Sequence, residues 1–299
     1  MPPVIVVVAN YKGGVGKTTL ASLLAVTLSL KIGRRILVVD ADPQANITEV
    51  FVPPRYYGVL ERGAKDYNMA FSLDWIIGTT GNPLKVGLLD NLFLVPSKPE
   101  FMRIAKTYVV PGERVEVLRR DIKVKFKDMD YIIFDLPPQM YGLVGPLVKL
   151  GDVLISPVTK GVFSLVSLKY LIEDVKSQPP VDRPIFIGAV LTRFRAIETR
   201  VINDYREMVR RYVKQAYSKV NVKWELSEGS FSIDFSNILY AHPKLASIRA
   251  LPFDRKEHPR LIRLIKGELK YSNEVIKIAE PIAKEFEMRV KLSTEGAQL

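Results

Sequence analysis

The stretch from Val4 to Thr19 constrains the fold more than any other part of the chain. It joins an apolar, largely β-branched run to a glycine-rich loop, and a helix-forming segment follows directly. An apolar run of this kind predicts a strand buried on both faces of a sheet, and glycine permits the tight turn into a helix. The chain therefore contains a strand-loop-helix unit typical of α/β folds.

Short β-branched runs recur along the chain with helical patterns between them. Besides the first run, at residues 4–9, they occupy residues 36–39, 92–95, 131–134, 153–158 and 185–190. Because these runs alternate with helices, we expect a doubly wound, mostly parallel sheet flanked by helices, in one domain over residues 1–299. Residues 18–31 should form the helix after the loop, with Gly33 as its C-cap.

Three other segments have a distinct pattern. Residues 53–90 are rich in Gly, Pro and Tyr, contain no clear strand, and are expected to be an insertion or surface helices. A helical pattern is also expected at residues 257–289. After Thr199 a third helix is predicted from apolar residues at helical spacing, namely Val201, Tyr205, Met208, Val209, Tyr212 and Val213.

Charge and composition narrow the possible partners. The net charge of +12 comes from 44 Lys and Arg against 32 Asp and Glu, which favours a polyanion such as nucleic acid or an acidic membrane surface. The chain has no cysteine, which excludes disulfides and thiolate-bound metal clusters, so we expect a cytoplasmic protein. Neither a signal peptide nor an apolar run of about 18 residues that could span a membrane is apparent.

The glycine-rich loop matches the phosphate-binding pattern G-x-x-x-x-G-K-[ST] except at its first position, which is Tyr11. Its glycines allow backbone N–H groups to surround a phosphate at the positive end of the next helix. Lys17 would bridge the β- and γ-phosphates, and the Thr18 hydroxyl would bind Mg²⁺. The predicted nucleotide-binding residues of the loop are Lys12, Gly13, Gly14, Val15, Gly16, Lys17, Thr18 and Thr19. A glycine turn without a ligand is the alternative.

Carboxylates end two of the expected strands. Asp135 follows the run at 131–134, where it could hold Mg²⁺ through water. Asp40 and Asp42 end the second strand, and residues two apart on a strand point the same way. One of them could serve the metal and the other could orient the attacking water. Simple turn formation is the alternative for all three.

Three segments together resemble the ParA/Soj partition ATPases, a branch of the deviant Walker A superfamily. They are Asn10–Thr19, Asp40–Thr48 and Phe134–Pro138, in matching order and spacing. Weaker similarity extends to about residue 195. The resemblance implies an ATP-hydrolysing enzyme with slow intrinsic turnover that uses ATP and Mg²⁺.

The resemblance also assigns roles to individual residues. Lys12 would reach the phosphates of a partner subunit in an ATP-dependent sandwich homodimer, where it would offset repulsion between two nucleotides. Asp42 would be needed for hydrolysis but not for ATP binding, so Lys12, Lys17 and Asp42 are the predicted catalytic residues. Asp40, Asp135 and Thr18 would form the magnesium shell. The adenine pocket would include Thr192, Pro252, Phe253 and Asp254.

Positive charge concentrates in two segments. Residues 181–222 hold nine Lys or Arg against four Asp or Glu, and residues 241–271 hold eight against three. ParA proteins bind DNA without sequence preference, so a nucleoid-associated DNA partner is expected, with phosphate contacts that weaken in salt. A solvated helix face is the alternative. The candidate DNA-binding residues are Arg193, Arg195, Arg200, Arg210, Arg211 and Arg249.

The resemblance further implies a ParB-like centromere-binding partner that stimulates hydrolysis. Two competing functions remain open. A membrane-associated spatial regulator of the MinD type shares the extra lysine, but residues 290–299 lack the basic amphipathic helix that such proteins carry. A P-loop kinase or biosynthetic ATPase would need an acceptor pocket, which residues 53–90 could provide. We expect no membrane partner.

Overall fold

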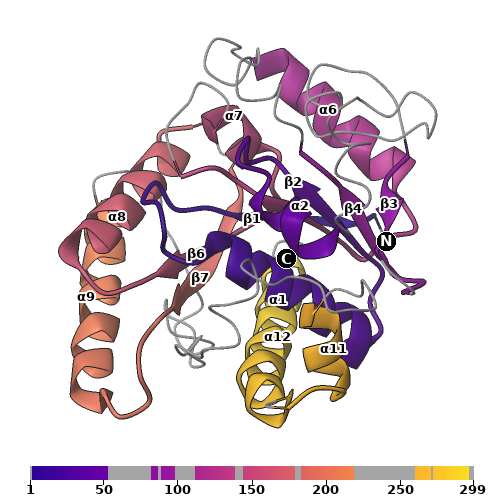
Figure 1. Cartoon of the computed structure of the whole chain (residues 1–299). Helices are drawn as coiled ribbons and strands as arrows, with labels where there is room; N and C mark the ends of the chain where they lie inside the picture. The colour runs from indigo at the N-terminus through magenta and orange to yellow at the C-terminus, as the bar shows by residue number, and fades with distance from the viewer. Residues whose placement is uncertain are drawn as a thin grey trace.

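The computed structural model describes residues 2–52, 82–86, 89–97, 112–138, 144–178, 183–218, 260–270 and 272–295. In this part of the chain seven strands form one sheet in the order β3-β4-β2-β5-β1-β6-β7 (Figure 1). The strands are β1 (Val4–Val8), β2 (Ile36–Asp40), β3 (Leu84–Lys85), β4 (Leu92–Val95), β5 (Tyr131–Asp135), β6 (Val153–Val158) and β7 (Ile185–Leu191). The predicted mostly parallel sheet is confirmed.

The strand β1 lies near the middle of the sheet, paired in parallel with β5 on one side and β6 on the other. Every residue of β2, β5 and β6 is buried, as expected for strands covered on both faces. The strand β3 was not predicted, because two residues are too short to give a pattern. It pairs antiparallel with β4 at the sheet edge, which corrects the expectation of no strand in residues 53–90. Most of that segment lies outside the described residues.

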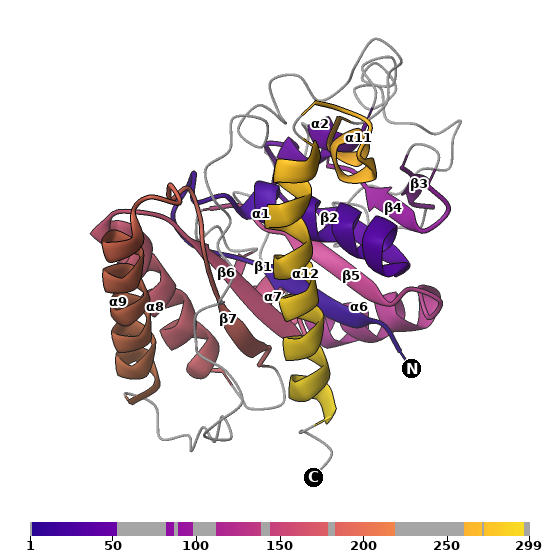
Figure 2. The same cartoon turned by 90° about the horizontal axis from the view of Figure 1, so that it is seen from below.

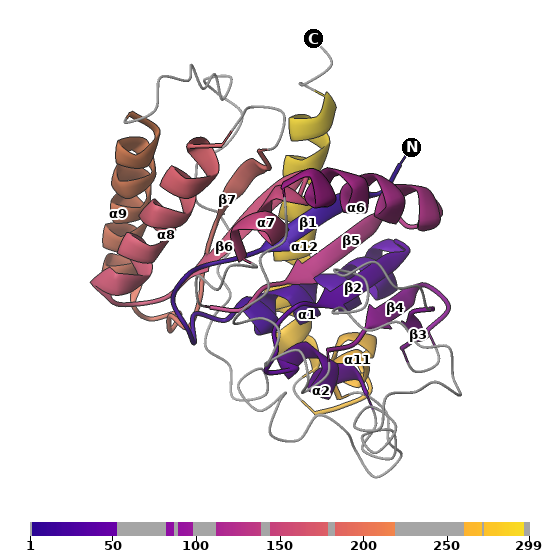
Figure 3. The same cartoon turned by 90° about the horizontal axis from the view of Figure 1, so that it is seen from above.

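Helices cover the two faces of the sheet as separate groups. On one face α1 (Lys17–Thr27), α2 (Asn46–Phe51), α11 (Arg260–Lys266) and α12 (Ser272–Glu295) contribute to one apolar cluster (Figure 2). On the other, α6 (Gly112–Lys125), α7 (Val144–Lys149), α8 (Val162–Lys176) and α9 (Thr199–Ser218) contribute to a second (Figure 3). The helices α8 and α9 lie side by side next to β7 in all three views. The expected doubly wound architecture is therefore present.

The helix after the glycine-rich loop ends as predicted. After α1 the chain makes a π-helical turn, Leu28–Ile32, and Gly33 follows with a φ of 83°. A left-handed residue at this position closes a helix, and glycine adopts it without a Cβ clash. The predicted C-cap is confirmed.

The C-terminal helical segment differs from the single run expected at residues 257–289. It forms two helices, and α12 continues to Glu295. Arg289, which is 1% exposed, donates from Nη1 to the carbonyl of Ile187 at 2.9 Å and bonds Glu285 at 2.7 Å. This buried pair fixes α12 against β7. Among the described residues, no helix combines the length and apolar character needed to cross a membrane.

The helix α9 buries only some of the apolar residues that indicated it. Val201 and Met208 are each 39% exposed, whereas Ile202, Val209 and Val213 are buried. Both sets have helical spacing, so periodicity alone could not choose between them. The predicted helix is confirmed, and the structure adds that Val201 and Met208 lie on its outer surface.

Candidate nucleotide site

The glycine-rich loop, Asp40 and Asp135 meet at the carboxyl ends of adjacent strands. The loop follows β1, and β5 lies between β1 and β2. In the parallel register Asp40 is paired with Asp135, and Val8 is also paired with Asp135. Ligands of open α/β sheets bind in the crevice outside these strand ends. The sheet therefore brings together residues that are far apart along the chain.

The loop backbone is shaped by two left-handed glycines. Gly14 has a φ of 72° and Gly16 a φ of 100°. Gly16 is the N-cap of α1 and, having no side chain, does not cap the N–H groups of the first turn. The first N–H groups of a helix lack intrahelical partners, and the helix dipole is positive there. The end of the loop therefore suits an anion such as a phosphate.

Lys17 lies inside the loop. Its side chain is 6% exposed, and Nζ donates to the carbonyls of Asn10 at 3.0 Å and Lys12 at 3.1 Å. Burial lowers the pKa of Lys17, while the charges of Asp135 and Asp42 oppose that shift. The amine is thus held by two backbone carbonyls, and the charges of Asp135 and Asp42 favour its charged form against the effect of burial.

Asp40 organises the backbone that follows β2. Its Oδ2 accepts bonds from the N–H of Thr48 at 2.9 Å and from the Thr48 hydroxyl at 2.6 Å, and its Oδ1 accepts from the N–H of Asp42 at 3.2 Å. The side chain is fully buried, and burial raises its pKa well above the usual value, with a further contribution from Asp135. Asp40 therefore positions Asp42 and α2. A metal would have to share its oxygens with these internal donors.

The charges of Asp135 and Asp42 raise the pKa of Lys17 against the effect of burial. Asp42 is 5% exposed, and its Oδ1 accepts the N–H of Gln44 at 2.9 Å in a local turn. Asp135 is 1% exposed. In the described part of the chain no three His, Cys, Asp or Glu side chains form a metal site by themselves. The donor set still fits Mg²⁺, which binds proteins through one or two carboxylates together with phosphate oxygens and water.

The neighbours of Lys12, the second lysine of the loop, contact β6 and α8 and so hold its backbone indirectly. Its backbone N–H donates to Oδ1 of Asn10 at 2.9 Å, and the Asn10 amide bonds Ser156 and Pro157 at the end of β6. The neighbouring Tyr11 donates its hydroxyl to Asp174 of α8 at 2.7 Å. Asn10 was not among the predicted site residues. The signal available was a polar amide directly after a fully apolar strand.

The residues after β7 contact the loop. Thr192 donates its hydroxyl to the carbonyl of Val15 at 2.6 Å. Arg193 adopts a left-handed φ of 63°, and its Nη1 is 4.0 Å from the position of a Cβ built on Gly14. Phe194 is fully buried and packs edge-to-face against Tyr205. Arg193, predicted to bind DNA, therefore lies beside the phosphate loop.

The remaining predicted residues lie partly at this site and partly away from it. Arg195 is exposed in the segment before α9, and Arg200, Arg210 and Arg211 are exposed along the helix. Thr18 and Thr19, in the first turn of α1, are partly buried, and Gly13 is exposed beside Pro138. Arg249, Pro252, Phe253 and Asp254 lie outside the described residues, so the adenine pocket stays a prediction.

The sequence was compared with known families and proteins. A family model described as an AAA domain matches residues 4–179, more than half of the chain. The sporulation initiation inhibitor protein Soj of Bacillus subtilis is 29% identical over 223 residues, which cover 72% of this chain and 82% of the relative. The chromosome partitioning protein ParA of Myxococcus xanthus is 29% identical over 227 residues, which cover 73% and 74% of the two chains.

Solved structures share the fold. The structure of pNOB8 ParA bound to nonspecific DNA superposes with a TM-score of 0.75 at 17% identity, covering 97% of this chain and 99% of that one. The ATP complex of a Cyanothece McdA variant superposes with a TM-score of 0.63 at 19% identity, covering 96% of each chain. The family match, the order of the motifs and the shared fold agree. The chain therefore belongs to the AAA-domain family and, within it, to the ParA/Soj-type partition ATPases.

Proposed function

We propose that the protein is an ATP-dependent DNA partition ATPase. The observation that carries this proposal is the buried Lys17, whose amine donates to two loop carbonyls and whose charged form is favoured by Asp135 and Asp42. A γ-phosphate is the ligand that suits such a cation at a helix N-terminus. ATP and Mg²⁺ are the proposed cofactors, and the fold likeness to an ATP complex supports this choice.

Each residue of the site would then have a defined role in binding or hydrolysis. Lys17 binds the β- and γ-phosphates, and the loop N–H groups bind the remaining oxygens. Thr18 and Asp135, with Asp40 behind them, would hold Mg²⁺, which neutralises charge on the phosphates. Asp42 orients the attacking water and accepts its proton. The intrinsic rate would be slow.

Lys12 supports the proposal that the active form is a homodimer. Lys17 already occupies the loop, so a second lysine has no evident task in one subunit. Two facing nucleotides repel each other unless opposite charge lies between them. Lys12 of each subunit would supply that charge to the nucleotide of the other.

The Lys12→Ala variant tests the dimer. We expect it to bind ATP with near wild-type affinity and to stay monomeric, whereas the wild type dimerises with ATP and Mg²⁺. Multi-angle light scattering with ATP, with ADP and without nucleotide measures this. Lys31→Ala, which removes an exposed lysine at the far end of the same strand-loop-helix unit, is the control. An ATP-dependent Lys12→Ala dimer would contradict the proposal.

The proposed DNA partner rests on the exposed arginines of α9 and on the net charge of +12. The fold neighbour bound to nonspecific DNA is consistent with it. We expect ATP-stimulated binding to duplex DNA of any sequence, with an affinity that falls steeply as salt rises. Fluorescence anisotropy over a salt series measures this. Absence of ATP-stimulated binding at low salt would contradict the DNA role while leaving the ATPase proposal standing.

A ParB-like centromere-binding protein is the proposed stimulating partner, and the nucleoid is the proposed location. Both follow from family membership. Addition of such a protein together with DNA should raise ATP turnover well above the rate with DNA alone. An unchanged rate with the cognate partner would contradict this part of the proposal.

A further inference from the structure

The loop Thr159–Gly161, between β6 and α8, contacts both the nucleotide site and α9. On the nucleotide side, Nζ of Lys12 is 3.4 Å from the position of a Cβ built on Gly161. Gly161 has a φ of 107°, which a residue with a side chain rarely adopts. The backbone at Gly161 therefore forms the surface on which the Lys12 ammonium rests.

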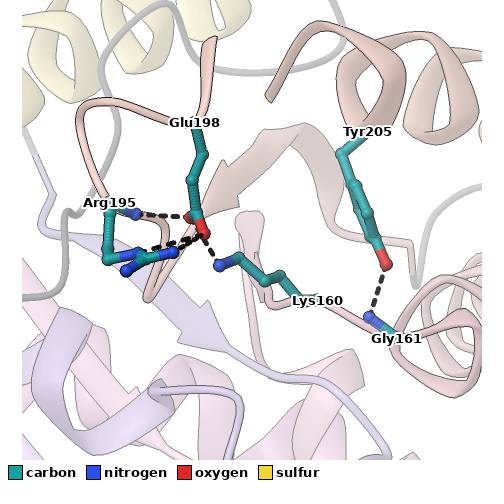
Figure 4. A network of polar contacts seen from close by, with 5 residues as sticks. All are labelled: Lys160, Gly161, Arg195, Glu198 and Tyr205. Carbon is teal, nitrogen blue, oxygen red and sulfur yellow. Dashed lines mark hydrogen bonds and ion pairs between the residues drawn. The ribbon is translucent and has the colours of Figure 1, made fainter. Parts of the chain in front are cut away.

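The helix α9 also contacts Gly161, through a hydrogen bond to its backbone. The N–H of Gly161 donates to the hydroxyl of Tyr205 at 2.6 Å (Figure 4). The Tyr205 ring packs edge-to-face against the buried Phe194, with a centroid distance of 5.2 Å. Tyr205 is thus fixed by its ring and bonds the loop through its hydroxyl.

The charged side chains beside this bond make a second link between the loop and α9. Lys160 pairs with Glu198, which immediately precedes α9, and its Nζ lies 5.4 Å from the centroid of the Phe194 ring. Glu198 also accepts the N–H of Arg195 at 2.8 Å (Figure 4). The side chain of Glu198 is 14% exposed. The bond from Lys160 and the bond from Arg195 lower the pKa of Glu198 to about 2. The carboxylate therefore stays charged at physiological pH.

Local bonds already define the start of α8 without α9. The N–H of Thr159 donates to the Ser164 hydroxyl at 3.0 Å, and the N–H of Ser164 donates to the Gly161 carbonyl at 3.0 Å. The contacts from Tyr205 and Glu198 are additional and come from a distant part of the chain. Their effect is to tie the position of the loop to the position of α9.

We infer that Tyr205 and Glu198 are positioning residues that couple nucleotide binding at Lys12 to DNA binding on α9. The inference rests on the proposed function, in which Lys12 reaches the nucleotide of the partner subunit and α9 contacts DNA phosphates. To reach that nucleotide, the Lys12 ammonium has to leave Gly161. A shift of the Thr159–Gly161 loop then moves α9 through the bonds to Tyr205 and Glu198. Conversely, DNA bound to α9 moves the same loop and with it the backbone against which Lys12 rests. By linkage, the two ligands must raise each other's affinity by the same factor.

The Tyr205→Phe variant tests this inference. It keeps the ring packing and removes only the hydroxyl that bonds Gly161. The affinity for a non-hydrolysable ATP analogue is measured with and without duplex DNA, and the affinity for DNA with and without the analogue. In the wild type the coupling factor should be in the range of about 5- to 150-fold, and in Tyr205→Phe it should fall to about two-fold or less. The affinity for each ligand alone should stay near the wild-type value.

Tyr212→Phe is the matched control, because Tyr212 is a partly buried tyrosine of the same helix. Its coupling factor should equal that of the wild type. A charge swap provides a second test. Lys160→Glu and Glu198→Lys should each lower the coupling factor, and the double variant should restore part of it, because the ion pair returns but the bond from the Arg195 N–H does not. This restoration distinguishes a positioning role from general destabilisation.

Three results would overturn the inference. In the first, Tyr205→Phe melts at a lower temperature but keeps the wild-type coupling factor. In the second, the double charge swap is no better than either single variant. In the third, wild-type protein binds ATP and DNA independently, which would also remove the DNA role in the proposed function. The first two results would leave the proposed function intact.

Discussion

Residues in the site have two kinds of role. Some would contact the nucleotide, and others hold those residues in position. Lys17 donates to carbonyls of the loop, and the charge of Asp42 raises the pKa of that lysine, whereas Asp40 accepts three bonds from Asp42 and Thr48. In the sequence pattern Asp40 and Asp42 are equivalent carboxylates, two residues apart at a strand end. The hydrogen bonds separate them, because the oxygens of Asp40 are engaged by the backbone and the helix that follow β2.

Replacement of Asp42 should separate ATP binding from hydrolysis. In Asp42→Asn the Oδ1 that accepts the Gln44 N–H is kept, so the local turn survives. The general base is removed, and we expect the turnover rate to fall by about 10²- to 10⁴-fold. Single-turnover hydrolysis and nucleotide titration measure the two effects. Asp128→Asn, at an exposed surface ion pair, is the control, and near-normal hydrolysis by Asp42→Asn would contradict the assignment.

Elements of the structure are joined by a few buried side chains. Thr48 in α2 donates its hydroxyl to Asp40 at the end of β2 and accepts the N–H of Ser97 after β4. One hydroxyl thus connects two strand ends and a helix. The equivalent link on the other side of the sheet is the set of bonds between α9 and the Thr159–Gly161 loop.

Removal of the Thr48 hydroxyl should destabilise the fold. Thr48→Val keeps the shape of the side chain but leaves the Ser97 N–H and one Asp40 oxygen without this partner. We expect the free energy of unfolding to fall by about 1–3 kcal/mol, measured by urea denaturation. Thr294→Val is the control, because its hydroxyl bonds the backbone of its own helix. Equal decreases in the two variants would contradict the role of Thr48.

Glu198 should contribute a pH-dependent stability. Its folded pKa of about 2 lies below the unfolded value of about 4.3. The unfolded chain therefore binds more protons between these values, so the contribution is complete above about pH 4.3 and disappears as pH falls toward 2. Glu198→Gln should be less stable than the wild type at pH 7, and the difference should shrink below about pH 4.

Thermal melting between neutral and acidic pH measures this difference. The control Glu280→Gln removes the acidic partner of Lys284 within α12 and does not touch the Thr159–Gly161 loop. A stability difference between wild type and Glu198→Gln that stays constant down to about pH 3 would contradict the shifted pKa.

At the scale of the whole molecule, the fold determines which arginine side chains lie on the same surface. Arg200 and Arg211 are both exposed on α9, at the end of the sheet next to β7 (Figure 1). Arg193, although close to Arg200 along the chain, lies against the phosphate loop instead. Position along the chain is thus a poor guide to which arginines could contact DNA.

The double variant Arg200→Ala/Arg211→Ala should weaken DNA binding uniformly across sequences. The slope of log affinity against log salt should become shallower by about 1 for each DNA phosphate that the variant no longer neutralises. A salt series of anisotropy titrations measures it. Arg120→Ala, at an exposed arginine of α6, should leave the slope unchanged. A weaker affinity with an unchanged slope would indicate a structural effect.

Local pattern in the sequence was sufficient for the longer strands, the phosphate loop and the family. Strand positions were predicted closely, because buried parallel strands are continuous apolar runs. The loop with Lys17, the helix end at Gly33 and the ParA/Soj resemblance were likewise readable from neighbouring residues. The short strand β3, the exposed side of α9 and the position of Arg193 became known only from the folded chain. They depend on contacts between distant segments, such as the bond from Thr192 to Val15 across 177 residues, which no local spacing encodes.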